Sequence, residues 1–155
     1  MPLLSLTLNI NNSPVIINGL FDSKLFLNNV KDAQFAFIQN STLSSNFSMI
    51  EIQVIDNYVN ISDKFGELTI NKFYPKFDKF VLNLSNSNAI LNFNKVKTSI
   101  TYNLVKSKID TQANKDFFKI KFNAEEVINS KTTTINSLFN NYFELNSEFS
   151  NIMIK

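Results

Sequence analysis

Several residue types that support common protein chemistry are missing from this sequence of 155 residues. It contains no Cys, His, Trp or Arg, and only two Gly. Without Cys there is no disulfide framework, thiolate nucleophile or Cys-based metal site. Without His there is no side chain that ordinarily titrates near neutral pH, and no imidazole ligand. The lack of Arg removes the planar group that grips phosphate or guanine, and two glycines exclude the glycine-rich loops that hold nucleotides.

The residues that are abundant are Asn, Ile, Lys and Phe, and Phe alone occurs sixteen times. Their codons are rich in A and T, so an AT-rich genome explains most of this bias. With 44% hydrophobic and 18% charged residues, the composition predicts a chain that folds. The length predicts one β-rich domain spanning residues 1–155. A formal net charge of +2 is small for a nucleic-acid-binding protein, so we expect no nucleic-acid partner.

No apolar run approaches the roughly 20 residues that a membrane-spanning helix needs, so no membrane span is predicted. The first residues, Met1 to Ser5, lack the basic region and the long apolar region of a secretory signal. We therefore expect the protein in a virion or in the cytoplasm of the cell that produces it.

Short segments of alternating apolar and polar residues recur through most of the chain, a period typical of half-buried strands. Leu4 to Ile10 is the clearest of them, and Val96 to Val105 is the longest. In Phe118 to Phe122 the intervening residues are lysines, which discourage edge-to-edge aggregation. Further strands are predicted near residues 15–17, 25–30, 33–37, 50–54, 58–61, 68–70, 81–84 and 90–93, with no internal repeat.

The period changes towards the C-terminus. Apolar residues from Ile135 to Tyr142 follow helical spacing, which predicts one short helix from about Thr134 to Asn146. Phe149, Ile152 and Ile154 predict a terminal strand. Many short strands with turn signals at close intervals favour a mainly β fold, an antiparallel sandwich or jelly-roll-like domain.

Carboxylates are the principal candidates for acid–base chemistry, since Lys and Tyr are weaker options. The thirteen Asp and Glu are scattered, and none is paired at a spacing that specifies a catalytic dyad. Glu125 and Glu126 fit the first turn of a helix better. Asp56 and Asp63 fit turns better than the spaced oxygen ligands of a calcium loop. We therefore predict no catalytic residue, no metal site and no cofactor, and expect that the protein is not an enzyme.

Five Lys-Phe pairs resemble the alternation of cations and aromatic rings on which single-stranded nucleic acid stacks. Lys and Phe are both so common here that strand alternation alone accounts for the pairs. Five Asn-x-Ser/Thr triplets are likewise close to the number expected by chance, and they carry no prediction of glycosylation. The pairs begin at Lys64, Lys72, Lys76, Lys79 and Lys121, and the triplets at Asn11, Asn40, Asn46, Asn60 and Asn83.

These properties favour a structural or assembly protein that acts through protein subunit interfaces. The leading hypothesis is a virion component of a virus or phage, such as a capsid, tail or decoration subunit, which forms homo- or hetero-oligomers. The alternative is a cellular surface or envelope β-domain that binds a glycan or a protein. The two hypotheses differ in oligomeric state, because the first predicts a large symmetric assembly and the second a monomer.

The chain has more apolar side chains than one small core needs, which predicts an exposed patch that another subunit covers. Aromatic side chains supply much of the binding energy at such interfaces. The other interpretation is that these side chains fill the core, and it is favoured for Phe80, Phe139 and Tyr142. The candidate interface residues lie around Pro75 and near the C-terminus: Phe73, Tyr74, Phe77, Phe80, Phe139, Tyr142, Phe143 and Phe149.

Overall fold

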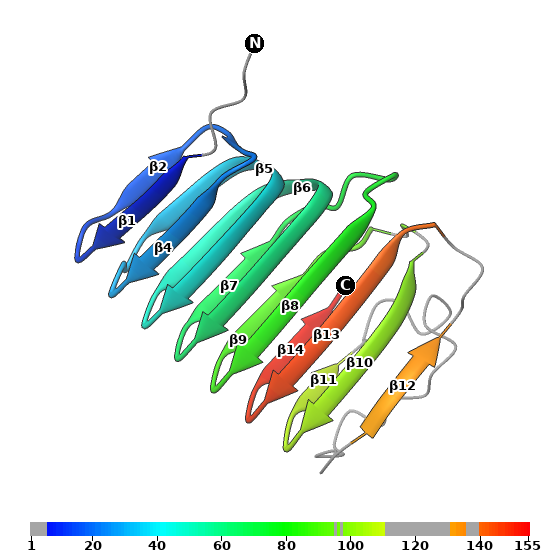
Figure 1. Ribbon diagram of the computed structural model, residues 1–155. Coiled ribbons are helices and arrows are strands. Elements are labelled where there is room, and N and C mark those ends of the chain that lie inside the picture. The colour runs from blue at the N-terminus through cyan, green and yellow to red at the C-terminus, as the bar shows by residue number, and fades with distance from the viewer. Residues whose placement is uncertain (1–5, 95, 97, 111–130, 136–139) are drawn as a thin grey trace.

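The fold consists of strands stacked along one axis in two facing layers (Figure 1). The computed structural model describes residues 6–94, 96, 98–110, 131–135 and 140–155. Most of these residues are in strands and none is in a helix, so the prediction of a mainly β fold is confirmed.

The front layer in Figure 1 contains one row of strands, and the back layer a second row. Two long strands, β5 and β6, run from the back layer into the front layer. Along the axis the front layer is β1 (Thr7–Asn11), β4 (Lys24–Asn28), the ends of β5 (Ala33–Asn46) and β6 (Met49–Lys64), β8 (Lys79–Ser85), β13 (Tyr142–Glu148), β10 (Ser99–Val105) and β12 (Lys131–Ile135). The back layer is β2 (Val15–Ile17) with β3 (Leu20–Phe21), the starts of β5 and β6, β7 (Glu67–Ile70), β9 (Asn88–Leu91), β14 (Asn151–Ile154) and β11 (Lys108–Asp110).

The repeating unit is an arch, which we define as a front-layer strand, a tight corner and the back-layer strand that follows it. Equivalent strands of neighbouring arches pair in parallel, for example β1 with β4 and β7 with β9. Among the described strands, β12 alone pairs antiparallel, with β10. The predicted antiparallel arrangement is therefore wrong. Alternating apolar residues identify the buried face of a strand, and this pattern is the same for both pairing directions.

The chain coils with a regular period in its N-terminal half, which the sequence did not reveal as a repeat. Thr7 pairs with Lys24, Lys24 with Thr42, and Thr42 with Asn60. Hydrogen-bonded neighbours in these coils are 17 or 18 residues apart. The period then lengthens, so that hydrogen-bonded partners in the next arches are 21 residues apart. The repeated feature is a conformation rather than a set of residues, which is why comparing residue identities does not find it.

A two-residue motif forms most of the corners. A residue with a positive φ is followed by a buried serine, as in Asn86-Ser87 and Phe149-Ser150. The serine hydroxyl donates to the carbonyl two residues earlier, at 3.2 Å for Ser87 and 2.8 Å for Ser150. It also accepts a backbone N–H from the adjacent arch, since the Ser87 nitrogen lies 3.0 Å from the Ser150 Oγ. The buried hydroxyls of Ser87 and Ser150 thereby gain hydrogen-bond partners.

The last arch of the chain is not the last arch in space. The arch of β13 and β14 pairs on one side with β8 and β9, and on the other side with β10 and β11. The chain leaves a gap of one arch between β9 and β10, and its own C-terminal segment fills that gap. Ser87 therefore hydrogen-bonds across 63 positions of sequence to Ser150.

The predicted C-terminal helix is wrong in its described part. Tyr142–Glu148 forms β13, while residues 136–139 lie outside the described residues. Residues 142 to 147 alternate between half-buried and buried, as in a strand. Parallel partners on both sides outweigh the helical spacing of the apolar residues. The terminal strand predicted around Ile152 is confirmed as β14. The predicted strand at 118–122 lies outside the described residues.

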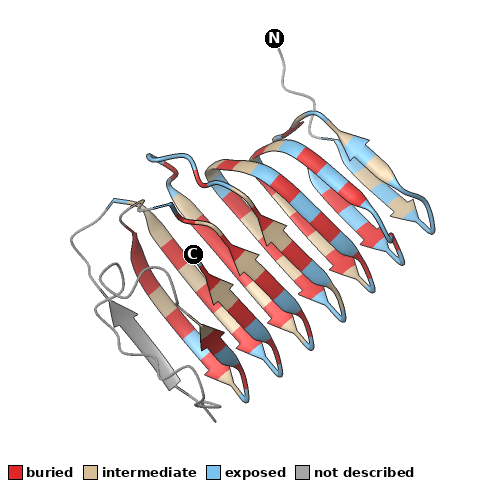
Figure 2. Ribbon diagram, turned by 180° about the vertical axis from the view of Figure 1, so that it is seen from behind, coloured by how far each residue is buried: buried red, intermediate tan, exposed pale blue. Residues whose placement is uncertain are grey.

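One continuous apolar core fills the space between the two layers. It runs from Leu20 through the successive arches to Ile154. Figure 2 shows the alternation of buried and exposed residues along the strands. The side of the core that the tight corners leave open is closed, in the middle of the stack, by an aromatic cluster. There Phe73 stacks on Phe93 with ring centroids 4.1 Å apart, and Phe80 stacks on Phe143 with ring centroids 5.2 Å apart.

Candidate interaction surfaces

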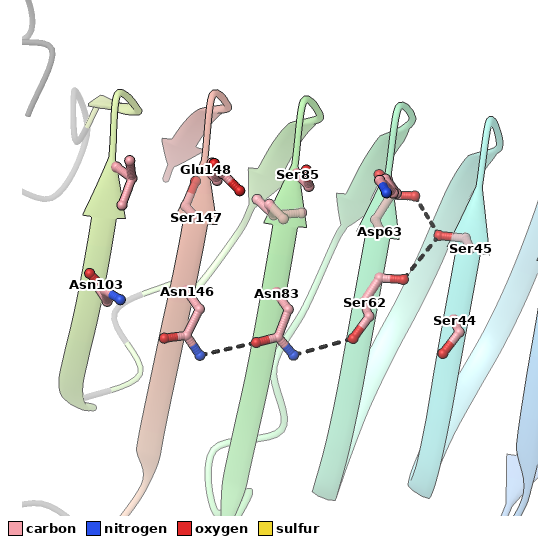
Figure 3. A pocket seen from close by; sticks show the side chains of 13 residues that line it. Ser44, Ser45, Ser62, Asp63, Asn83, Ser85, Asn103, Asn146, Ser147 and Glu148 are labelled. Atoms are coloured by element: carbon pink, nitrogen blue, oxygen red, sulfur yellow. Dashed lines mark hydrogen bonds between the residues drawn. The ribbon is translucent and has the colours of Figure 1, made fainter. Parts of the chain in front are cut away.

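Polar side chains on the outer face of the front layer line a shallow groove of about 600 Å³ (Figure 3). Ser62, Asn83 and Asn146 are direct partners across β6, β8 and β13. Asn146 donates to Asn83 at 3.0 Å, and Asn83 donates to Ser62 at 3.2 Å (Figure 3). Part of the hydrogen-bonding capacity of the groove is thus used between neighbouring strands. The groove can hydrogen-bond a polar ligand, but its residues do not form an acid–base pair aimed at one point.

The carboxylates predicted to have turn roles lie apart from one another. Asp56 accepts the backbone N–H of Asn57 at 2.8 Å, next to the bend where β6 changes layer, in agreement with the predicted turn. Glu125 and Glu126 lie outside the described residues. Within the described part of the chain, no three side chains of the acidic, His or Cys types come together as a metal site.

Asp63 is a buried carboxylate, with only 2% of its surface exposed. Its Oδ1 accepts the hydroxyl of Ser45, and its Oδ2 has no hydrogen-bond partner. Burial raises the pKa of the Asp63 carboxyl above its ordinary value of 3.8, and the hydrogen bond from Ser45 opposes that rise.

The position of Asp63 follows from the corner beside it. Gly66 stands there in place of the corner serine, and a Cβ on Gly66 would meet the two Asp63 carboxylate oxygens at 2.7 and 2.8 Å. The Asp63 carboxylate therefore occupies the space that a side chain at position 66 would need.

Exposed phenylalanines stand at three corners. Phe47, Phe65 and Phe149 all have positive φ angles, between 49° and 56°, which is unusual for a bulky residue. Phe47 and Phe65 stack with ring centroids 5.0 Å apart, and Lys106 lies 5.2 Å from the Phe149 ring. Each ring of the stacked pair covers one face of the other, and Phe47 and Phe65 remain 57% and 44% exposed.

The structure divides the eight aromatic residues predicted for an interface. Four of them are at most 1% exposed and belong to the core: Phe73, Phe77, Phe80 and Phe143. These four lie in the core of the single chain, which corrects the interface prediction for Phe73, Phe77 and Phe143 and agrees with the core interpretation favoured for Phe80. The segment around Pro75 spans the open side of the two layers, so its phenylalanines turn inward, and Phe143 faces inward from β13.

The other four predicted residues have different positions. Tyr74 and Phe149 are exposed at 48% and 47%, so their contact with a partner stays a prediction. Tyr142 is half-buried, and its hydroxyl hydrogen-bonds to Thr101. Phe139 lies outside the described residues.

The N-terminal end of the stack has an open edge that sequence reasoning did not single out. No described strand pairs with the outer edges of β1, β2 or β3. The inward side chains of β1 and β2 are only half-buried, unlike those of the inner arches. Ile16, on the outer face of β2, is 75% exposed, and Leu6 and Phe21 are 49% and 47% exposed. The end of the core is therefore partly open to solvent.

The open edge also lacks charge. No Asp, Glu, Lys or Arg occurs before Asp22. Free strand edges are normally protected by lysine, proline, a bulge or a covering segment, and β1 and β2 contain no lysine and no proline. The absence of charge over the first 21 residues is the sequence signal that points to this edge.

Comparison with family models, with curated proteins and with solved structures finds no match for the chain. No helix in the described part of the chain is long and apolar enough to cross a membrane. The functional argument therefore depends on the surfaces themselves.

Proposed function

We propose that the protein is a non-enzymatic structural or assembly protein, and that it works through a protein–protein interface at its N-terminal arch. The observation that carries this proposal is the open edge of β1 and β2, which combines unpaired strand edges, exposed apolar side chains and a complete lack of charge. Such an edge is a template for another strand.

Strand geometry specifies which backbone groups are available at this edge. The Leu6 carbonyl accepts from Lys24 at 2.8 Å, and the Asn12 N–H donates to Asn28 at 3.1 Å. Even-numbered residues of β1 therefore direct their backbone groups to β4. The alternation of a strand directs those of Thr7, Asn9 and Asn11 outwards. A partner strand would satisfy these groups and cover Leu8 and Ile10, which are half-buried.

The proposed setting is a virus or phage virion, in which the chain would act as a capsid, tail or decoration subunit. Support for this setting comes from the size of the chain, its apolar composition and the lack of a recognisable catalytic set. The alternative, a surface or envelope β-domain that binds a glycan or a protein, is favoured by the exposed part of the polar groove. A fold does not by itself specify a function, so the two settings must be separated by the behaviour of the surfaces.

Light scattering after size-exclusion chromatography tests the proposal. We expect an oligomer whose mass falls to that of the monomer when Ile16→Lys introduces a charge at the open edge. Ile16 is 75% exposed, so this substitution should leave the melting temperature nearly unchanged. Met49→Lys is the matched control, because Met49 is also exposed, at 52%, but lies in β6, away from the edge.

Two results would contradict the proposal. One is a wild-type protein that stays monomeric up to its highest soluble concentration, which would favour the alternative. The other is an oligomer that Ile16→Lys leaves intact, because the interface would then lie elsewhere.

A further inference from the structure

We infer that the occupant of the open N-terminal edge is a second copy of this chain, joined through a two-fold axis that pairs β1 with β1 of its partner in antiparallel orientation. This inference rests on the proposed function and specifies its partner and geometry. It depends on two properties of the stack: a flush N-terminal end and an uncharged edge.

The N-terminal end is flush, because both layers end in the same arch. Among the described strands, β1 ends the front layer, and β2 with β3 ends the back layer. A two-fold axis perpendicular to the layers places front layer beside front layer and back layer beside back layer. The side chains of Leu8 and Ile10 that face the core in one copy then continue into the core of the other copy.

Another flush end provides a matching partner for this end. In an isologous dimer, the front layer of one copy pairs with the front layer of the second copy, and the back layer pairs with the back layer.

The uncharged edge permits this self-pairing. A two-fold axis brings every side chain near its own counterpart, so any charge close to the axis would face a like charge. The segment from Thr7 to Ile17 contains no charged residue. Ile16, on the outer face of the short strand β2, would contact Ile16 of the second copy, which accounts for its exposure of 75% in the single chain.

Antiparallel pairing also occurs within the chain at the other end of the stack. There β12 closes the parallel front layer by pairing antiparallel with β10 over five residues. The pairing between two copies of β1 would have the same length, because β1 also contains five residues. Its centre is Asn9, whose backbone groups point outwards and whose side chain is exposed.

Disulfide trapping tests this geometry, and the absence of natural Cys makes a single introduced thiol unambiguous. In an antiparallel hydrogen-bonded pair the Cα atoms are about 5.5 Å apart, within the range that a disulfide spans. Asn9→Cys should therefore form a covalent dimer on mild oxidation. Asn103→Cys, an equally exposed position in the front-layer strand β10, is the matched control and should remain monomeric on a non-reducing gel.

The outcomes separate this inference from the proposed function. An oligomer that Ile16→Lys disrupts, but in which Asn9→Cys does not cross-link, overturns the two-fold pairing and leaves the interface in place. Cross-linking of Asn9→Cys at the same rate in the Ile16→Lys background would indicate random collision and also overturns it. A monomeric wild-type protein overturns both. Rapid cross-linking at Asn9 that Ile16→Lys abolishes supports both.

Discussion

The first and last arches of the chain differ in how completely neighbouring arches cover them. At the C-terminal side, β13 and β14 lie between earlier arches, and β12 covers the edge of β10. Phe143 and Leu145 in β13 are completely buried. At the N-terminal side, β1 has one neighbour, and its inward residues Leu8 and Ile10 are only half-buried. Among the described strands, the C-terminal arch is therefore covered on both sides, whereas the N-terminal arch is covered on one side.

This difference indicates that the burial of a strand in this coiled β fold depends more on the number of neighbouring arches than on the sequence of the strand itself. β1 has a cleaner alternation of apolar and polar residues than β13, yet β13 is the more deeply buried strand. An inner strand has neighbours on both sides, while an end strand has one neighbour unless another chain supplies the second. Three paired perturbations test the comparison, in order of decreasing effect.

Matched leucine substitutions should show the largest difference. Leu145→Ala removes a completely buried side chain and should lower the free energy of unfolding by about 3–5 kcal/mol. Leu8→Ala removes a half-buried side chain and should cost only about 1–2 kcal/mol in the monomer. Urea denaturation at a protein concentration that keeps the chain monomeric measures both. Equal losses would mean that the N-terminal arch is as well covered as the inner arches.

The two glycines provide a second pair. A Cβ on Gly66 would lie 2.4 Å from the Ser48 carbonyl oxygen, a backbone atom that cannot move aside. Gly66→Ala should therefore destabilise the fold by about 1–3 kcal/mol or more. A Cβ on Gly19 would meet the Phe21 ring, which is 47% exposed and can turn away. Gly19→Ala should change stability by less than about 1 kcal/mol. Thermal melting of both variants distinguishes a tight inner corner from a loose end, and a larger loss for Gly19→Ala would contradict this comparison.

Asp63 gives a pH-dependent test of the inner arches. Because burial raises the pKa of its carboxyl, the native state binds this proton more tightly than the unfolded state. The contribution of Asp63 to stability is therefore greatest below pH 3.8 and is lost as pH rises through the native pKa. Asp63→Asn should remove this fall and raise the melting temperature at neutral pH.

The control for this pH dependence is Glu67→Gln, which removes an exposed carboxylate beside the same corner. We expect it to retain the wild-type fall in stability with rising pH. A drop in melting temperature for Asp63→Asn at neutral pH would show that the charged carboxylate stabilises the corner.

The strands were largely predictable from the sequence, but their pairing was not. Alternation identified the strands at Leu68 to Ile70 and at Ile50 to Val54, because a half-buried strand needs that period whatever its neighbours are. The direction and the order in which the strands pair depend on the conformation of the corners. A phenylalanine or lysine with positive φ before serine, as at Phe47 or Lys106, does not resemble the usual glycine or asparagine turn signals. The insertion of β13 between β8 and β10 joins residues far apart in sequence, which no local pattern reveals.

The candidate surfaces were only partly predictable. The excess of apolar residues predicted that some aromatic side chains would lie in the core and others on the surface. Composition does not specify which residues lie in which place. The side chains of Phe73 and Phe77 close the open side of the two layers, and that depends on the path of the segment after β7. The open edge had a sequence signal, the absence of charge before Asp22, but it becomes meaningful only once β1 is known to end the stack.

Residue-resolved amide hydrogen exchange across a range of protein concentrations tests the central claim most directly. In the single chain, the N–H of Leu8 points to β4 and that of Asn9 points outwards. The account predicts that the Asn9 amide exchanges rapidly at low concentration and becomes protected as concentration rises, whereas Leu8 is protected throughout. Ile16→Lys should abolish the protection of Asn9 without affecting Leu8. An Asn9 amide that exchanges rapidly at every concentration would show that the open edge is not paired, and would contradict the account.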